Sequence, residues 1–263
     1  MLHLELHDVS KNFGGNLAVD NVTLTVDGPQ LIGMIGPNGA GKTTLANLMS
    51  GMLNPSRGTI SLNGRSINGR PAYEVARAGL GRTFQVTRAL RRMTVLENML
   101  VPAWARYPND SKAQIEERAR EVLDFLTMSH LAQEYGRALS GGQQKLLELA
   151  RLLMLDPNII ILDEPFAGVH PRLQQTIYAY IDRVYKDGKA VLLISHDMDA
   201  VFELSQRLLV LNFGALIADG EPEAVRSDPA VIEAYLGEDD EEDAAQANGA
   251  DNASGASTWF ADR

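Results

Sequence analysis

Apolar and polar residues alternate in the opening segment of the chain. The alternation runs through residues 2–7, and the same period returns at residues 22–26. A period of two predicts strands with one buried face. Residues 31–35 form a nearly continuous apolar run that ends at Gly36, which favours a strand buried on both faces. Another short strand is expected over residues 59–62, before the turn-forming pair Asn63-Gly64.

Helical periodicity dominates residues 90–137. Apolar residues recur there at helical spacing within 114–125, with charged residues between them. Further helices are expected over residues 42–50, 143–155, 173–185 and 230–236. Strands are expected over residues 158–162 and 190–194, and a hairpin over 208–211 and 215–218. Strands that alternate with helices predict an α/β fold with a mainly parallel sheet.

Composition narrows the chemistry further. The 263 residues include no cysteine, which excludes disulfides, thiolate catalysis and cysteine-ligated metals. No apolar run approaches the ~18 residues of a membrane-spanning helix, and the N-terminus does not resemble a signal peptide. We therefore expect an intracellular protein. Residues 238–263 hold eight acids against one base, a formal −7 out of a total of −10. This tail is predicted to be disordered, and the nearly neutral remainder offers no electrostatic case for nucleic-acid binding.

A glycine-rich loop follows the buried strand at residues 31–35. Its sequence is Gly36-Pro37-Asn38-Gly39-Ala40-Gly41-Lys42-Thr43, and a helix is expected immediately after it. Glycines let such a loop wrap closely, so that its N–H groups and the helix N-terminus face phosphate oxygens. We expect Lys42 to reach the β- and γ-phosphates of a nucleotide and Thr43 to bind Mg²⁺.

Two acids end a second buried strand. The apolar residues 159–162 lead directly into Asp163 and Glu164. A strand that ends here brings a carboxylate to the carboxyl edge of the sheet, where α/β proteins bind ligands. Asp163 is expected to hold Mg²⁺, and Glu164 is expected to orient and polarise an attacking water.

A Ser-Gly-Gly sequence precedes the helix predicted over residues 143–155. Ser140 suits an N-cap, and Gly141 and Gly142 leave backbone N–H groups open at a helix N-terminus. The segment can be a second anion site or simply a capped helix.

Together, in this order, the three motifs resemble those of the nucleotide-binding subunits of ATP-binding cassette (ABC) transporters. Three further residues match that family: Gln85 at its Q-loop glutamine, His196 at its switch histidine and Phe13 at the aromatic position that stacks on adenine. The resemblance covers about residues 2–237. It implies a P-loop NTPase core over about 1–85 and 156–237, with an N-terminal antiparallel β portion and an inserted helical subdomain over about 86–155.

The resemblance also implies the site. Nucleotide would bind Phe13, Gly36, Pro37, Asn38, Gly39, Ala40, Gly41, Lys42, Thr43 and Thr44. Glu164, His196 and Gln85 would be catalytic, and Thr43, Gln85 and Asp163 would hold Mg²⁺ as the cofactor. Ser140, Gly141, Gly142 and Gln143 would act on the partner's ATP.

In that family two cassettes pack head to tail and clamp two ATP molecules. The expected partners are thus ATP, a second ATPase subunit (a copy or a paralogue), integral permease subunits and, indirectly, a solute-binding protein, at the cytoplasmic face of the membrane. One position departs from the family: His170 stands where Asp or Asn is common in a loop that crosses the dimer interface.

Alternatives remain at the level of function. A non-transport cassette ATPase usually has a long coiled-coil insertion or two cassettes, and a regulatory module without turnover would lack Glu164 or His196. For the cargo, residues 79–85, 94–98 and 231–237 resemble subunits for uptake of branched-chain or other hydrophobic amino acids. Residues 163–169 resemble the ATPase of lipopolysaccharide export.

Overall fold

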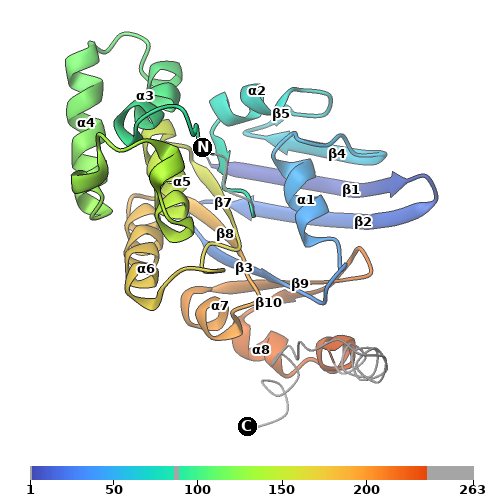
Figure 1. Ribbon diagram of the computed structural model, residues 1–263. Coiled ribbons are helices and arrows are strands. Elements are labelled where there is room, and N and C mark those ends of the chain that lie inside the picture. Colours follow the sequence, from blue (N-terminus) through green and yellow to red (C-terminus); the bar gives the residue numbers. More distant parts are fainter. Residues whose placement is uncertain (1, 86–88, 236–263) are drawn as a thin grey trace. The chain divides into compact units, whose positions relative to one another are not determined.

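A computed structural model of the chain describes residues 2–85 and 89–235. The chain divides into two compact units. The first comprises His3–Gly69 together with residues 192–235, and the second comprises Arg70–Val191. Figure 1 colours both units by position along the chain.

Antiparallel strands open the first unit. They are β1 (His3–Phe13), β2 (Asn16–Asp27), β4 (Arg57–Leu62) and β5 (Arg65–Ser66), in the order β2-β1-β4-β5 (Figure 1). The predicted alternation is confirmed, since Leu4, Leu6 and Leu24 are buried. Both strands extend beyond the predicted segments. The period breaks because the pairing of β1 with β2 shifts between Leu6 and Val9, around a left-handed Asp8.

The other strands of the first unit include a parallel pair. Strand β3 (Leu31–Ile35) runs parallel to β9 (Arg207–Asn212), which turns back into antiparallel β10 (Ala215–Gly220). The helices are α1 (Lys42–Met49), α7 (Met198–Leu204) and α8 (Pro222–Arg226), and residues 229–235 are also helical. Helix α7 packs closely on β3, because a Cβ added at Gly33 would lie 2.6 Å from a methyl of Val201.

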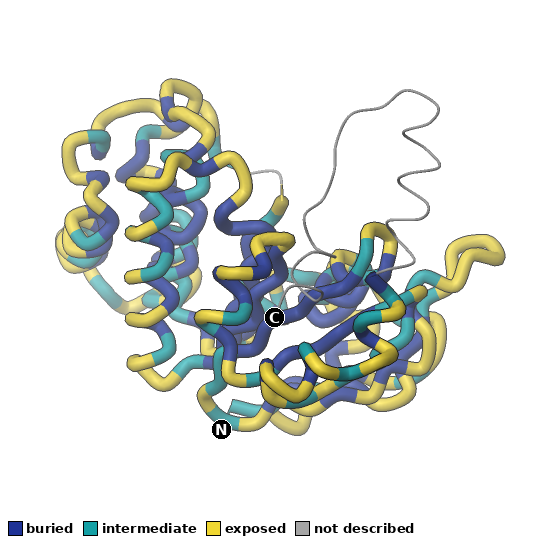
Figure 2. The backbone as a smooth tube through the Cα atoms, turned by 90° about the horizontal axis from the view of Figure 1, so that it is seen from below, coloured by how far each residue is buried: buried dark blue, intermediate teal, exposed yellow. Residues whose placement is uncertain are grey.

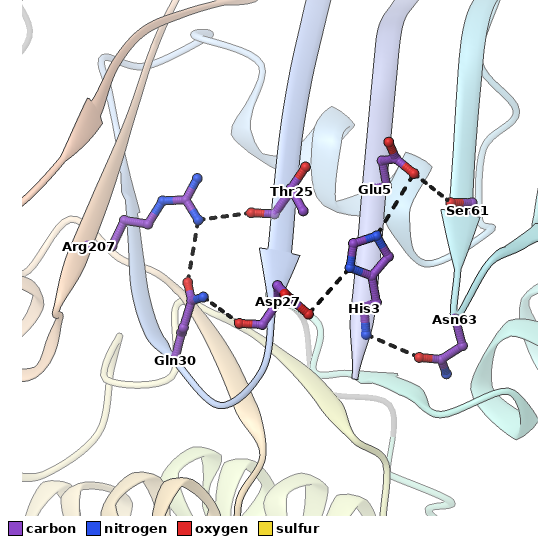
Figure 3. Close-up of polar contacts among 8 residues, drawn as sticks. All are labelled: His3, Glu5, Thr25, Asp27, Gln30, Ser61, Asn63 and Arg207. Carbon is purple, nitrogen blue, oxygen red and sulfur yellow. Dashed lines mark hydrogen bonds and ion pairs between the residues drawn. The ribbon is translucent and has the colours of Figure 1, made fainter. Parts of the chain in front are cut away.

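Arg207 links β9 to the N-terminal strands (Figure 3). One of its Nη groups donates to the carbonyl of Thr25 at 2.9 Å and to Gln30 Oε1 at 3.4 Å. Gln30 in turn donates to the carbonyl of Asp27, and the other side of the guanidinium pairs with Asp219 on β10. The polar network thus ties both groups of strands of the first unit together.

The second unit is largely helical. It contains α2 (Ala72–Arg77), α3 (Val95–Arg106), α4 (Lys112–Phe125), α5 (Gly141–Leu155) and α6 (Pro171–Lys186), with short 3-10 turns at Ser129–Leu131 and Gly136–Ala138. Its strands β6 (Leu80–Arg82) and β7 (Ile159–Asp163) pair in parallel. Strand β8 (Ala190–Ile194) begins in the second unit and ends in the first. Figure 1 shows α3, α4 and α5 side by side.

Three helices of the second unit begin with the same capping structure. Helices α3, α4 and α5 each begin with a capping box, formed by Thr94 with Glu97, Ser111 with Gln114, and Ser140 with Gln143. On α4 the buried residues lie on one side and are Ile115, Ala119, Val122 and Leu123, as the spacing predicts. Helix α5 is buried more completely, since the consecutive residues 146–150 are all buried. Figure 2 shows helices whose tube alternates between buried and exposed residues, which is typical of one-sided packing.

The fold class is confirmed as α/β, with an antiparallel N-terminal portion and parallel core pairs. The proposed limits of a helical subdomain at about 86 and 155 stay a prediction. The predicted helix over 230–236 is found at 229–235, and position 236 and the acidic tail lie outside the described residues. Among the described residues, no helix combines the length and apolar content needed to cross a bilayer.

Candidate functional site

The glycine-rich loop joins β3 to α1 in the first unit. It forms a tight turn in which the Ala40 N–H donates to the carbonyl of Pro37 at 3.1 Å. Gly36 has φ 147°, and a Cβ there would lie 2.1 Å from the carbonyl oxygen of Leu211. Gly41 has φ 101°, and a Cβ there would lie 2.4 Å from the carbonyl oxygen of Ala18. Neither position can hold another residue without moving backbone, so the neighbouring strands impose the shape of the loop.

Lys42 and Thr43 begin α1 directly after this loop. The Lys42 ammonium is buried and donates to the carbonyls of Gly36 and, at 2.9 Å, Pro37. It therefore lies across the loop. Thr43 is exposed in the first helical turn, where backbone N–H groups have no intrahelical acceptor. Positive charge and open N–H groups at one point suit an anion.

The turn between β9 and β10 braces this loop, a contact that sequence patterns did not reveal. The Gly214 N–H donates to the carbonyl of Ala40 at 3.0 Å, and the Gly214 carbonyl accepts from Asp20 at 2.8 Å. Phe213 beside it is left-handed and 85% exposed. Hydrophobicity predicted the hairpin but not its partner, because the partner lies far away in the sequence.

Phe13 ends β1 in the same unit. Its ring is 47% exposed, and the Lys11 ammonium lies 5.1 Å from the ring centroid. The ring is thus no part of the core and has a surface open to a planar ligand. Its stacking on adenine stays a prediction.

The acid pair lies in the second unit, at the end of β7. Asp163 is only 2% exposed, and its carboxylate accepts from Arg82 Nη2 at 2.8 Å. Its N–H donates to Thr83 Oγ1 at 2.9 Å. Both partners come from β6 and the segment after it, so the pairing of β6 with β7 creates this environment. The Asp163 charge is balanced inside the unit.

Glu164 directly follows and has a left-handed backbone with φ 49°. Such a conformation costs a non-glycine residue about 1–2 kcal/mol. The main-chain carbonyl of Glu164 accepts from the ammonium of Lys145 on α5, and the residue as a whole is buried. Strain in a buried acid at a strand end is the kind of outlier found at functional sites.

The residues predicted to hold a metal offer hard oxygen donors. These are the Thr43 hydroxyl, the Gln85 amide carbonyl and the Asp163 carboxylate, of which Thr43 and Gln85 are exposed. Such donors fit Mg²⁺, which keeps waters and substrate phosphates among its ligands. Within the part of the chain that the structure describes, no cluster of three or more His, Cys, Asp or Glu residues forms a metal site by itself.

Ser140 is the N-cap of α5, as the sequence predicts. Its Oγ accepts from Gln143 N at 3.4 Å, and its own N–H donates to Gln143 Oε1 at 2.9 Å. Gly141 is exposed, with open space around a built Cβ, whereas a Cβ on Gly142 would lie 3.1 Å from Leu173. The helix start is therefore both capped and open to a ligand, so the two alternatives from the sequence are compatible.

Three other predicted residues lie at exposed loop positions. Gln85 lies three residues after the end of β6, and residues 86–88, which follow it, lie outside the described residues. His196 lies two residues after the end of β8. His170 is exposed and caps α6, with Nδ1 accepting from Arg172 N at 3.3 Å. An imidazole nitrogen here replaces the cap oxygen that Asp or Asn would supply, which accounts for His170 locally.

The first unit thus holds Phe13, the glycine-rich loop and His196, and the second holds Gln85, the Ser140 segment and the acid pair. Sequence patterns missed two charged partners of the acid pair in the second unit, Arg82 and Lys145. They also missed Glu148, which accepts from the N–H of Phe84. A signal was available for Glu148, because it interrupts a run of leucines, and a charged residue in such a run needs a partner when it is buried.

Two family descriptions match the chain. The family described as "ABC transporter" matches residues 19–167, and the family described as "Branched-chain amino acid ATP-binding cassette transporter" matches residues 215–241. The high-affinity branched-chain amino acid transport ATP-binding protein BraF of Pseudomonas aeruginosa is 40% identical, covering 89% of this chain and 98% of that protein. Its counterpart LivG of Escherichia coli is 38% identical, with coverages of 89% and 98%.

Solved structures agree in fold. A cassette of an ABC transporter in its ADP conformation has a TM-score of 0.77 at 35% identity, covering 90% of this chain and 99% of that one. A dimeric post-hydrolysis state of another cassette, bound to ADP and phosphate, has a TM-score of 0.78 at 25% identity, with coverages of 83% and 98%.

Proposed function

The chain belongs to the ATP-binding cassette transporter family, and from that premise we propose that it is an ATPase subunit that works as a head-to-tail pair. The observation that carries the proposal is Glu164, a buried and strained acid directly after Asp163 at the end of β7. A carboxylate in that place can accept a proton from water that attacks a phosphate.

Each motif has a task in the proposed reaction. Lys42 and the first turn of α1 bind the β- and γ-phosphates, and Phe13 stacks on the base. Thr43, Gln85 and Asp163 supply oxygen ligands for Mg²⁺, which would balance phosphate charge when bound. Glu164 accepts the proton of the attacking water, and His196 contacts the γ-phosphate. Ser140, Gly141 and Gly142 donate N–H or O–H groups to the ATP held by the partner.

Glu164→Gln tests the reaction step. The amide keeps the shape of the side chain but is a poor proton acceptor, so we expect kcat to fall by about a hundredfold or more. ATP binding should persist, and a pair should accumulate in size-exclusion chromatography with ATP. Glu121→Gln makes the same change at an exposed position of α4 and should leave turnover unchanged. A Glu164→Gln protein that is monomeric and fully active would remove Glu164 from this role.

For the cargo, we propose import of branched-chain amino acids. BraF and LivG are named for branched-chain amino acid transport, and a C-terminal segment of this chain matches a family described by the same cargo. Residues 79–85 and 94–98 resemble the same branch. The ATPase would lie at the cytoplasmic face of the membrane on separate permease subunits, and a solute-binding protein would select the amino acid. The lipopolysaccharide-export alternative has no support among these relatives.

Uptake of labelled leucine, isoleucine and valine measures the cargo directly. Cells that lack this chain should lose uptake, the wild-type chain should restore it, and the Glu164→Gln chain should not. Normal uptake of all three amino acids in cells without a redundant system would overturn the cargo but not the ATPase. Urea or another small amide would then be the next cargo to test.

A further inference from the structure

One turn of α5 carries two charged residues that reach the segments next to the acid pair. Lys145 and Glu148 lie three positions apart and therefore on the same face of the helix. The Lys145 ammonium donates to the main-chain carbonyl of Glu164. Glu148 Oε1 accepts from the N–H of Phe84 at 3.3 Å. One helix face thus holds the backbone of the catalytic acid and the backbone one residue before Gln85.

The space around these contacts is too small to hold a substrate. Lys145 and Glu148 line a cavity of about 10 Å³, whose other walls come from Thr83, Phe84, Leu149, Asp163 and Pro165. That volume is roughly what one water molecule needs. The two side chains therefore act on the neighbouring segments and not on a bound ligand.

Carboxylates surround the Lys145 ammonium. Burial lowers the pKa of Lys145, and the Glu148, Glu164 and Asp163 carboxylates only partly oppose that shift. The neighbouring carboxylates and the small cavity therefore restrict the position of the Lys145 ammonium. Because the left-handed backbone of Glu164 is unfavourable by itself, a charge-assisted hydrogen bond to its carbonyl stabilises the conformation that the acid needs.

The same helix begins at the segment that faces the partner's ATP. Ser140 caps α5 five residues before Lys145, a rise of about 7.5 Å along the helix. If the capped start of the helix moves, the first turns move with it, because their backbone hydrogen bonds hold them together as one rigid segment. The helix thus connects the Ser140 segment with Glu164 and with the strand end that leads into Gln85.

We propose that Lys145 and Glu148 are positioning residues that link the Ser140 segment of each chain to Glu164 and Gln85 of the same chain. The inference rests on the proposed head-to-tail pair. When the Ser140 segment closes on the partner's ATP, α5 sets the backbone of its own Glu164. Each nucleotide therefore controls how ready the other site is to hydrolyse.

Lys145→Met removes the donor and the charge while keeping the length of the side chain. We expect kcat to fall about tenfold, with the KM for ATP and the thermal midpoint nearly unchanged, because the residue positions the acid and does not bind nucleotide. Lys145→Arg should recover most of the turnover. Lys112→Met, the same change on the exposed face of α4, is the control. An unchanged kcat would refute the role of Lys145, and so would a joint loss of turnover and stability that arginine does not repair.

Pairs made of two linked copies test whether Lys145 connects the Ser140 segment to Glu164. With Ser140→Arg on one copy only, the site that this residue faces is lost and the altered chain also fails to set its own Glu164, so well below half of the wild-type activity should remain. Adding Lys145→Met to the same copy should cause little further loss, because both changes break the same link. If Ser140→Arg on one copy leaves about half of the activity and Lys145→Met then removes most of the rest, the two sites are independent and the inference is overturned. Wild-type protein without ATPase activity, or a fully active Ser140→Arg pair, would instead overturn the proposed function itself.

Discussion

At the scale of single residues, two lysines are held by main-chain carbonyls. Lys42 donates to Gly36 and Pro37 within its own loop, and Lys145 donates to Glu164. A lysine bound in this way has a defined position before any ligand arrives, so less side-chain entropy is lost when it binds an anion. The same arrangement would therefore serve the proposed phosphate binding by Lys42 and the proposed support of the Glu164 backbone by Lys145.

Lys42→Ala should weaken nucleotide binding. The change removes a charge-assisted contact of about 1.5–3 kcal/mol, so we expect ATP affinity to fall roughly tenfold to a hundredfold. Titration with a fluorescent ATP analogue measures the affinity. Lys186→Ala, an exposed lysine paired with Asp182, is the control and should bind normally. Equal affinities for both variants would show that the loop does not bind phosphate.

At the scale of elements, the same capping structure begins more than one helix. The capping boxes of α4 and α5 have the same residue types, serine at the N-cap and glutamine three positions later. Only the α5 box is followed by two glycines, and Gly141 leaves the helix start open. One local structure thus stabilises both helices, while the glycines make one of them suitable for binding an anion.

Ser140→Arg should prevent pairing while preserving binding of ATP to the single chain. The bulky side chain occupies the open helix start, and the loss of the cap should lower stability by about 1 kcal/mol. Ser111→Arg loses an equivalent cap on α4 and serves as the control for that stability loss. Size-exclusion chromatography with ATP should show a pair for Ser111→Arg only. Loss of nucleotide binding by the Ser140→Arg monomer would contradict its action on the partner.

At the scale of the whole molecule, the predicted functions are distributed over two units. The glycine-rich loop lies in the first unit, and the Ser140 segment and the acid pair lie in the second. Strand β8 begins in the second unit and ends in the first. Most of the formal negative charge belongs to residues 238–263, outside every motif. Solubility and long-range electrostatics are therefore the properties on which this charge would act.

Deleting residues 238–263 should leave the ATPase activity of the assembled transporter within about twofold, since no residue of the proposed site is removed. The measurement is turnover at equal concentrations of assembled complex. A variant with the acids at 238–243 changed to amides separates the effect of charge from that of length. A loss above tenfold on deletion would assign the tail a regulatory or structural role.

The sequence by itself determined the elements whose signals are local. The loop at 36–43, the apolar strand ending in Asp163 and Glu164, and the Ser140 cap each occupy a short window in which spacing and residue type identify the structure. The order of these motifs was enough to indicate the family. The role of each site residue stays a prediction, because a local pattern identifies a motif and not what the motif binds.

Tertiary structure decided what surrounds those motifs. Arg82 meets Asp163 across 81 positions of sequence, and Glu148 meets Phe84 across 64. The turn at Gly214 braces the glycine-rich loop from still further along the chain. Periodicity reports which face of an element is buried but not which distant element covers it. Such contacts follow from strand pairing and helix packing, which depend on the path of the whole chain.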